Sequence, residues 1–445
     1  MTTSATMPGS PGPARAGDRA LPVLGALVSL PVGGALGLAL YGAPPPLALA
    51  LAGGFGLVLV LALALARYDA AVALGGLLLG VQVVDPAPAD GVFFVVMAVA
   101  LATRRFRLSS VPQPVVAMFA VFGALNIMAS IQVVDPERAV VFFGTTAYLA
   151  LFAIWLAGYT NSRRRARLLV RAYLGSAVVS AGIGALALLG ALPGAELLTE
   201  SDRSRAFFQD PNVFGPFLIP AVLILIEEIV RPRLLSARLA TKAVLLAILL
   251  VGVLFSYSRG AWVNLGLALV VLGLILSLRG GARTAATLFA VTTMTVAIIA
   301  MVVVATGSGD FLAERARPQT YDTDRFSGQR AGLRPAAEYP FGAGPGQFES
   351  VAHISAHSTY ARALGEQGYP GLLTLLALLG FTLIAGLRNV VAGRGTHGIG
   401  SASLLAAWCG LLANSAVIDT LHWRHLWVVA ALIWAATAVT RSRRD

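Results

Sequence analysis

Charged residues are scarce in this chain. Asp, Glu, Lys and Arg make up 12% of its 445 residues, whereas about 25% is usual in soluble globular proteins. Hydrophobic residues account for 57%, and the mean hydropathy is +0.78. This composition excludes an ordinary soluble domain and indicates a polytopic membrane protein.

Cysteine and lysine are almost absent. Cys409 is the only cysteine, so the chain cannot form an intramolecular disulfide, and its redox compartment is left open. Lys242 is the only lysine, which makes arginine the general basic residue and a single arginine weak support for function. A net charge of +12 would suit nucleic-acid binding in a soluble protein. Here the basic residues form short clusters between apolar runs, as topology signals do, so nucleic-acid binding is excluded.

Long apolar runs fill most of the chain. A helix needs ~20 residues to cross ~30 Å of hydrocarbon, so the sequence predicts an all-α polytopic membrane protein with about 12 to 14 transmembrane helices. The third and fourth candidates are short and can form one bent or re-entrant pair. The candidates are 21–41, 47–66, 70–84, 91–103, 113–131, 139–159, 168–192, 212–230, 241–257, 260–278, 284–306, 368–387, 399–418 and 423–440.

The distribution of charge tests this count, because cytoplasmic loops carry the excess of Arg and Lys. With the N-terminus inside, every second loop is net basic except the neutral Arg67-Tyr-Asp, and the C-terminus is also inside. The first apolar run is too long for a cleaved signal peptide. The predicted organisation is a disordered cytoplasmic tail (1–20), transmembrane helices (21–306), an extracytoplasmic loop (307–367), further transmembrane helices (368–440) and a cytoplasmic tail (441–445).

One pentapeptide occurs twice in predicted outer loops. Gln82-Val-Val-Asp-Pro86 recurs as Gln132-Val-Val-Asp-Pro136, and Val-Phe-Phe follows each copy. Asp at an N-cap and Pro at the first helical position predict that both copies start a helix. A substrate contact is the functional alternative.

Two polar motifs stand at the outer ends of predicted spans. In Arg203-Ser-Arg-Ala-Phe-Phe-Gln-Asp-Pro-Asn212, Asp210-Pro211 is a helix cap, and Arg205 and Asn212 are candidates for binding a polar ligand. In Ser256-Tyr-Ser-Arg-Gly-Ala-Trp262 there is no room for a long loop, so Arg259 lies at the bilayer boundary. Ionisable groups there are usually functional unless they reach water by snorkelling.

The third polar stretch, residues 324–366, is the longest in the chain. It contains Arg325, Arg330 and Arg334, each of which can also be a solvated loop charge. A helix from Ser350 to Gly365 would place His357 and Tyr360 on one face, together with Ala361 and Leu364.

The same helix would align Glu349, His353 and His357 at a spacing that metal sites use. The glycine-rich turn Gly342-Ala-Gly-Pro-Gly346 lies just upstream, and the backbone conformations that glycine favours argue against an unbroken helix through Glu349. No second acidic ligand is evident. We therefore expect no metal and no cofactor.

Histidine together with several arginines suits attack of a hydroxyl on a carbon that carries a diphosphate leaving group. Arginine binds phosphate oxygens through two donors and stays charged, so it offsets the charge that develops on the leaving group. Histidine titrates near neutrality and can accept the hydroxyl proton. A site at the membrane surface implies that a lipid carries the phosphate.

These motifs resemble the O-antigen ligase and polymerase (WaaL/Wzy-like) family of membrane glycosyltransferases. The resemblance covers residues from about 200 to 375, and the earlier spans match only in being hydrophobic. The resembling segments are Asp210-Pro-Asn212, Ser258-Arg-Gly-Ala, Arg330, Tyr339-Pro-Phe-Gly-Ala-Gly-Pro-Gly-Gln-Phe348 and His357-Ser-Thr-Tyr-Ala-Arg-Ala-Leu-Gly-Glu-Gln-Gly-Tyr-Pro-Gly371.

The resemblance implies a GT-C-like enzyme in the bacterial plasma membrane. It implies inverting, metal-independent transfer of a glycan from a polyprenyl-diphosphate donor to a hydroxyl of a glycan or lipid-glycan acceptor on the outer face. His357 is then the base, Arg259 and Arg330 hold the diphosphate, and Arg205 is a weaker candidate for the same role. Ser358 stands where the family commonly has Asn, so a role for that amide is in doubt. The span count exceeds the number usual in the family, which suggests an additional N-terminal hairpin.

Two other functions are compatible with a polytopic chain. A secondary transporter or flippase for an anionic or lipid-linked solute would carry charges in mid-span and inverted repeats of broken helices, whereas the charges here gather in outer loops. A non-catalytic scaffold for envelope assembly is the third hypothesis. The sequence does not distinguish a ligase from a polymerase or a protein glycosyltransferase.

Overall fold

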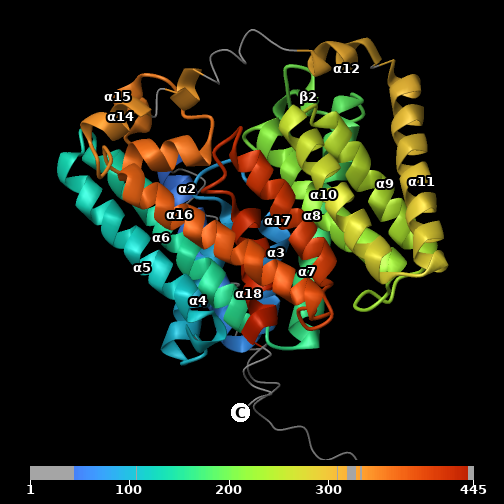
Figure 1. Ribbon diagram of the computed structural model, residues 1–445, viewed down its shortest axis with the longest axis horizontal. Helices are drawn as coiled ribbons and strands as arrows, with labels where there is room; N and C mark the ends of the chain where they lie inside the picture. Colours follow the sequence, from blue (N-terminus) through green and yellow to red (C-terminus); the bar gives the residue numbers. More distant parts are fainter. Residues whose placement is uncertain (1–44, 107, 308, 318–326, 331–332, 439–445) are drawn as a thin grey trace, which may run out of the picture.

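The described part of the protein is a bundle of helices that also contains a small β-hairpin. The computed structural model describes residues 45–106, 108–307, 309–317, 327–330 and 333–438 (Figure 1). The long and medium helices are α2 (Pro45–Ala66), α3 (Tyr68–Leu78), α4 (Pro88–Ala102), α5 (Gln113–Ala129), α6 (Pro136–Tyr159), α7 (Arg163–Leu188), α8 (Pro211–Val230), α9 (Leu239–Phe255), α10 (Arg259–Arg279), α11 (Ala282–Thr306), α16 (Thr359–Val391), α17 (Ser401–Ser415) and α18 (Arg424–Ala438).

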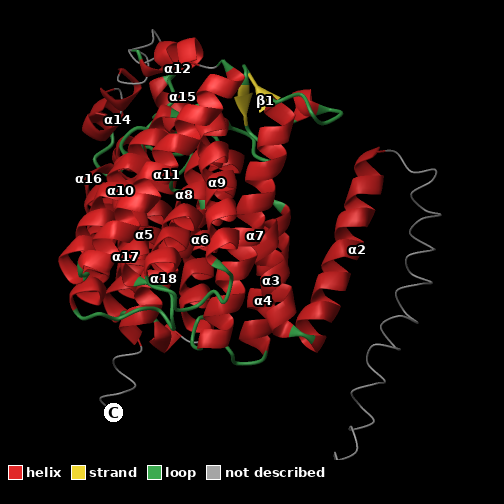
Figure 2. Ribbon diagram, turned by 90° about the vertical axis from the view of Figure 1, so that its right-hand side faces the viewer, coloured by secondary structure: helices red, strands yellow, loops and turns green. Residues whose placement is uncertain are grey.

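Short elements connect these helices. The strands β1 (Thr199–Glu200) and β2 (Arg203–Ser204) pair antiparallel beside α7 (Figure 2). The short helices are α12 (Gly309–Ala316), α14 (Leu333–Glu338) and α15 (Phe348–Ala352), with 3-10 turns at Leu108–Ser110, Ser130–Gln132 and Ala195–Leu197.

Seven of the described helices are long and apolar enough to cross a membrane, namely α5 to α8, α10, α11 and α16, and several others are apolar but shorter. The all-α polytopic membrane fold is therefore confirmed. Each predicted span from 47–66 onward overlaps one helix, and the short third and fourth candidates become the short helices α3 and α4. The predicted span 21–41 lies outside the described residues, as do both predicted tails.

The connections between helices gather at two opposite ends of the bundle. The elements α12, α14, α15 and β2 all lie at the upper end in Figure 1, while α18 ends at the lower end. Hydrogen bonds between segments at the same end support this division. At the first end Gln82 N donates to Phe207 O over 2.7 Å, and at the second Arg167 Nε donates to Leu234 O over 3.0 Å. We call them the motif end and the basic end, and they correspond to the two groups of loops that the charge pattern separates.

Helix α8 lies at the centre of the bundle. Of its apolar window 83% is buried, against 6% for the peripheral helix α11. Asp210 caps α8, because its side chain accepts a hydrogen bond from Asn212 N over 2.7 Å, and Pro211 is the first helical residue. The cap predicted from Asp210-Pro211 is confirmed, and it places the start of the most buried helix at the motif end.

The two copies of Gln-Val-Val-Asp-Pro differ in structure. The prediction is confirmed for the second copy, where Asp135 accepts from Arg138 N and Pro136 begins α6. It is wrong for the first copy, where the Asp85-Pro86 bond is cis and α4 begins only at Pro88. The reason is that Asp85 forms an ion pair with Arg424 of α18, and Asp90 instead accepts from the N-terminal backbone of α4.

The helix considered from Ser350 to Gly365 is not formed as one unit. Helix α15 ends at Ala352 and α16 begins at Thr359, because His353 and His357 both have positive φ, at 56° and 45°. This left-handed conformation interrupts a right-handed helix. Helix α16 therefore starts earlier than the predicted span 368–387, and it bends at Gly368, whose φ is 66°.

Candidate active site

Arg203, Asn212 and Ser258 join three elements at the motif end. Nη2 of Arg203 donates to Oδ1 of Asn212 over 2.9 Å, and the same oxygen accepts from Oγ of Ser258 over 2.9 Å. Nε of Arg203 donates to the carbonyl oxygen of Ser256 over 3.0 Å. Because Ser256 ends α9, Arg203 holds the connection between α9 and α10 against the start of α8.

Arg259 is the first residue of α10. Ser258 caps this helix through a hydrogen bond from Ala261 N to its Oγ, and Nη1 of Arg259 donates to the carbonyl oxygen of Arg317 over 3.3 Å. A helix N-terminus carries a partial positive charge and favours anions. Arg259 and the start of α10, with Arg203 bound to the same turn, therefore provide a setting for an anionic group.

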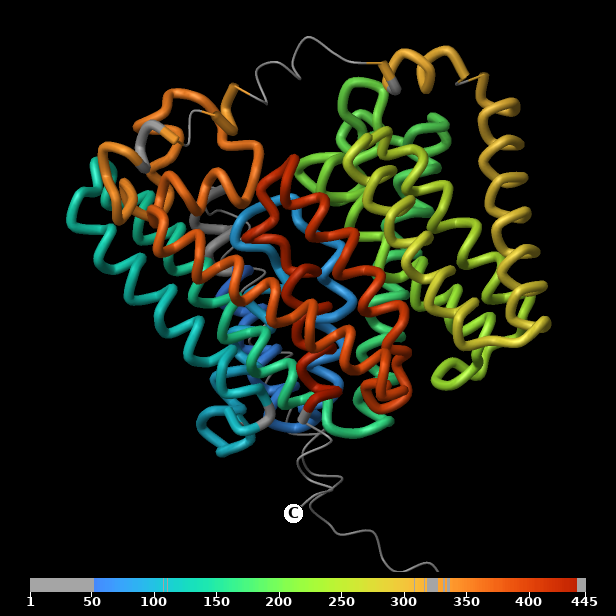
Figure 3. Tube along the Cα trace, viewed as in Figure 1, coloured from blue at the N-terminus to red at the C-terminus, as the bar shows by residue number. Residues whose placement is uncertain are grey.

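The C-terminal turn of α17 connects α10 to α16. Gly260 allows the close approach of α10, because a methyl group in place of its hydrogen would lie 2.9 Å from Oδ1 of Asn414. On the other side, Oγ of Ser358 donates to the carbonyl oxygen of Ser415 over 3.3 Å. Figure 3 shows this arrangement, with the red C-terminal helices between the orange α16 and the yellow-green α8 to α10. Residues far apart in sequence thus meet at one turn of α17.

His357 directly precedes the N-cap of α16. The cap is Ser358, whose Oγ accepts from Ala361 N, and the imidazole of His357 is half-buried. Gln329 lies against the same turn, since its Nε2 donates to the carbonyl oxygen of Ala416 over 2.9 Å. The structure thereby packs Gly260 and Ser358, the chain neighbours of Arg259 and His357, against the same turn at residues 414–415. We call Arg203, Asn212, Ser258, Arg259 and His357 the arginine–histidine cluster.

The other predicted site residues have different positions. Arg330 is exposed, and its segment packs near His357, because Gly328 approaches the backbone of Ser355. Tyr360 faces α17, where its hydroxyl donates to the carbonyl oxygen of Leu412 over 2.9 Å. Arg205 is bound within its own loop, with its Nη2 donating to the carbonyl oxygen of Leu197 over 3.2 Å. Arg325 lies outside the described residues.

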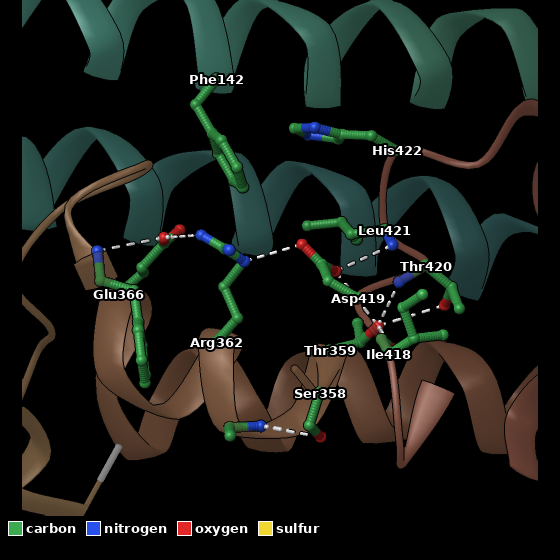
Figure 4. A network of polar contacts seen from close by, with 12 residues as sticks. Phe142, Ser358, Thr359, Arg362, Glu366, Ile418, Asp419, Thr420, Leu421 and His422 are labelled. Atoms are coloured by element: carbon green, nitrogen blue, oxygen red, sulfur yellow. Dashed lines mark hydrogen bonds and ion pairs between the residues drawn. The ribbon is translucent and has the colours of Figure 1, made fainter. Parts of the chain in front are cut away.

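A second polar group, the Arg362 network, lies beside this cluster. The buried guanidinium of Arg362 forms ion pairs with Glu366 at 2.8 Å and with Asp419 at 2.7 Å (Figure 4). It also forms an ion pair with Glu349. Arg138 of α6 pairs with the same Glu349 at 2.6 Å. Because Glu349 is occupied by two arginines, it does not align with His353 and His357 in the arrangement that a helical metal site would need.

Asp419 ties this network to the loop between α17 and α18. Its Oδ1 accepts from Thr359 Oγ1 over 3.2 Å and from Leu421 N over 3.1 Å. In the same loop His422 contacts α6, with its Nε2 2.9 Å from Thr146 Oγ1 and its ring 4.3 Å from that of Phe142. Burial lowers the pKa of His422 to about 4, so its imidazole is neutral at pH 7.

The glycine-rich turn packs the long loop onto α16 and α6. Gly342 has a φ of 92°, and a Cβ there would lie 2.2 Å from the carbonyl oxygen of Glu366, so this position needs glycine. The fully buried Gln347 accepts hydrogen bonds from Val134 N and Asp135 N over 3.1 and 2.9 Å. The motif therefore has a structural role, which is to fix the loop that carries His357 against the helices.

Sequence reasoning missed several residues of the site. Arg203, rather than Arg205, contacts Asn212 and Ser258. A signal was present, because alternate residues of an extended segment point to opposite sides and only one of the two arginines can face α8. Asn414 comes from the end of α17, inside a predicted span, and Asp419 comes from the loop that follows. No local pattern around either residue indicates a site.

Comparison with known protein families finds a match in the second half of the chain. Residues 244–376 match the family described as O-antigen ligase. The matched range includes Arg259, the glycine-rich turn and His357, so the predicted family resemblance is confirmed. A search of curated proteins found no match to the chain.

Proposed function

Because residues 244–376 carry an O-antigen ligase domain, we propose that this membrane protein is a glycosyltransferase that uses a polyprenyl-diphosphate-linked glycan as donor. The observation that carries this proposal is that Gly260 and Ser358, the chain neighbours of Arg259 and His357, pack against one turn at the end of α17, with Arg203 bound to the turn before Arg259. The donor diphosphate would bind at the start of α10, where Arg259 and the helix N-terminus favour anions.

In the proposed reaction, the acceptor hydroxyl oxygen attacks the anomeric carbon of the donor sugar from the side opposite the diphosphate. His357 takes the hydroxyl proton as the new glycosidic bond forms. The bond between the anomeric carbon and the diphosphate oxygen breaks, and Arg259 and Arg330 stabilise the charge that develops on the leaving group. Attack from the opposite side inverts the anomeric configuration.

We further propose that transfer needs no metal ion. Arginine side chains supply fixed positive charge at the phosphates, which is the task that a divalent cation performs in many phosphate-binding enzymes. Within the residues that the structure describes, no three His, Cys, Asp or Glu side chains gather where they could hold a metal. Transfer by the purified protein should therefore continue in EDTA, and activity that returns only with added Mg²⁺ or Mn²⁺ would contradict this part.

The proposed location is the bacterial plasma membrane, with the motif end outside and both termini in the cytoplasm. The support is the excess of arginine in the loops of the opposite end, which retains positive charge on the cytoplasmic side. The acceptor is then a glycan or lipid-glycan that is exposed on the outer face. Labelling of cysteines introduced at Gln209 and at Arg394 with an impermeant reagent tests this orientation.

The central test compares His357→Ala, Arg259→Ala and Arg330→Ala in a deletion strain. Mass analysis of surface glycans and lipid-linked intermediates should show that the deletion accumulates the donor, and that none of the three variants restores the product. His397→Ala is a matched control, because His397 is also half-buried with positive φ but lies at the basic end. Full transfer by all three variants, or solute transport without covalent transfer in proteoliposomes, would contradict the proposal.

A further inference from the structure

Five arginines occur in the first nine residues of α7, at the basic end. They are Arg163, Arg164, Arg165, Arg167 and Arg171. The first turn of this helix contains no acidic residue, although the partial positive charge of a helix N-terminus disfavours cations there. Asp69 of α3 pairs with two of them, at 3.2 Å from both Arg164 and Arg165. The start of α7 therefore keeps a local excess of positive charge.

Three of these arginines line one groove on the outside of the bundle. Arg164, Arg167 and Arg171 lie three and four residues apart, so they share one face of α7. The groove has a volume of about 450 Å³ and runs between α7 and α3. Its remaining lining is apolar and comes from both helices, namely Ala73, Leu77, Leu168 and Ala172.

Arg171 lies farther from the start of α7 than Arg164 and Arg167 do. It is eight residues after the first residue of α7, which corresponds to about 12 Å along the axis at 1.5 Å per residue. Arg171 is exposed on the outer surface of this apolar helix, next to the exposed Leu77. An arginine on a lipid-facing surface is costly unless its charge is matched. Arg167 is fixed in the groove, because its Nε donates to the carbonyl oxygen of Leu234 over 3.0 Å.

We infer that this arginine groove binds an anionic phospholipid from the leaflet at the basic end. Its phosphate would contact Arg164, Arg167 and Arg171, whose forked donors match phosphate oxygens. One acyl chain would lie along the apolar floor formed by Leu77 and its neighbours. A membrane lipid fits better than a soluble anion because cationic and apolar surfaces are continuous in one groove that opens to the outside of the bundle. This site is separate from the arginine–histidine cluster, which lies at the motif end.

The test uses the full chain purified in detergent, with phosphatidylglycerol as the probe and phosphatidylcholine as the neutral comparison. Native mass spectrometry measures retained lipid, and tryptophan fluorescence measures the thermal unfolding midpoint. Phosphatidylglycerol should be retained and should raise the midpoint. In R164Q/R167Q/R171Q its dissociation constant should rise on the order of a hundredfold, because each arginine near an anionic lipid contributes roughly fivefold.

The matched control is R279Q/R388Q/R394Q, which removes the same charge from exposed arginines of other basic loops and should keep the affinity of the natural protein. Equal loss in both triple variants would show general surface attraction and overturn the inference. A midpoint shift of the same size with inorganic phosphate would overturn the lipid as ligand. If the triple variant does not fold, R171Q alone should weaken retention about fivefold, and unchanged retention there would also contradict the site.

Discussion

The Arg362 network and the arginine–histidine cluster lie at the same end of the protein, yet their arginines have different surroundings. Arg362 is buried, and carboxylates of Glu349, Glu366 and Asp419 surround its guanidinium. Arg203 is half-buried and donates to a carbonyl oxygen and to the amide oxygen of Asn212. The comparison teaches that Arg362 joins helices through carboxylates, whereas Arg203 fixes the connection between α9 and α10 through the neutral oxygens of Ser256 and Asn212.

The largest effect should come from Arg362→Met. This change leaves the fully buried Glu366 without its cation, and the loss of one partner of a buried ion pair costs about 3–5 kcal/mol. The unfolding midpoint should fall sharply, as measured by circular dichroism in detergent. Arg362→Met with Glu366→Gln should recover part of that loss. A variant that unfolds normally but loses transfer would instead place Arg362 among the functional residues.

Arg203→Gln should have the next largest effect, and it should mainly lower the rate of glycan transfer. We expect about tenfold to a hundredfold less transfer, the size of one lost hydrogen bond to a charged group. The unfolding midpoint should fall as well, by less than in Arg362→Met, because Arg203 also holds the connection between α9 and α10 against α8. Arg205→Gln is the matched control, since Arg205 is bound within its own loop. Greater loss with Arg205→Gln than with Arg203→Gln would reverse the assignment made from the structure.

The pH dependence of the free energy of unfolding tests the region around the Arg362 network. The pKa of His422 is lowered to about 4 by burial, while an unfolded histidine titrates near 6.5. Between about pH 4 and pH 6.5, His422 binds a proton in the unfolded chain but not in the folded protein. The stability that the neutral His422 contributes is therefore complete above about pH 6.5 and is lost as the pH falls toward 4. The loss should be on the order of 1–2 kcal/mol, because the side chain is partly exposed.

The measurement is a series of unfolding midpoints from pH 7 to pH 4. His422→Gln should make this profile flatter than that of the natural protein. His353→Gln changes an exposed histidine at the same end and serves as the control. If both variants give the profile of the natural protein, other groups account for any loss of stability in acid.

Thr359→Val should have the smallest effect. The hydroxyl of the buried Thr359 accepts from Thr420 N over 2.7 Å and lies 3.2 Å from Oδ1 of Asp419. Loss of this hydroxyl should destabilise the protein by about 1 kcal/mol. Thr287→Val, which changes a half-buried threonine bonded within its own helix, should be nearly neutral. A loss of transfer in Thr359→Val at unchanged stability would show that the two clusters act together.

Much of the fold was predictable from the sequence, because membrane helices follow from local composition. Apolar runs of sufficient length must form helices in a bilayer, where each backbone group needs a partner within its own segment. The cap at Asp210 was predictable because it is also a local feature: the donor that Asp210 binds is Asn212 N, two residues away. The central motifs around Arg259 and His357 were also visible, although their assigned roles remain proposals.

The composition of the site could not be predicted in the same way. One partner of Arg203 lies in α8, and α17 provides the turn against which Gly260 and Ser358, the chain neighbours of Arg259 and His357, pack. The sequence also did not settle whether residues 350–365 form one helix, and the structure interrupts this segment at His353 and His357, which both have positive φ.

The repeated pentapeptide separates the two kinds of information most clearly. The sequence by itself determined that both copies of Gln-Val-Val-Asp-Pro end an apolar run at the motif end. Only the tertiary structure decided that Asp135 caps α6 while Asp85 pairs with Arg424. The physical reason is that a cap needs a donor three residues away in the chain, whereas an ion pair needs a partner that packing brings near, and a local sequence does not specify that partner.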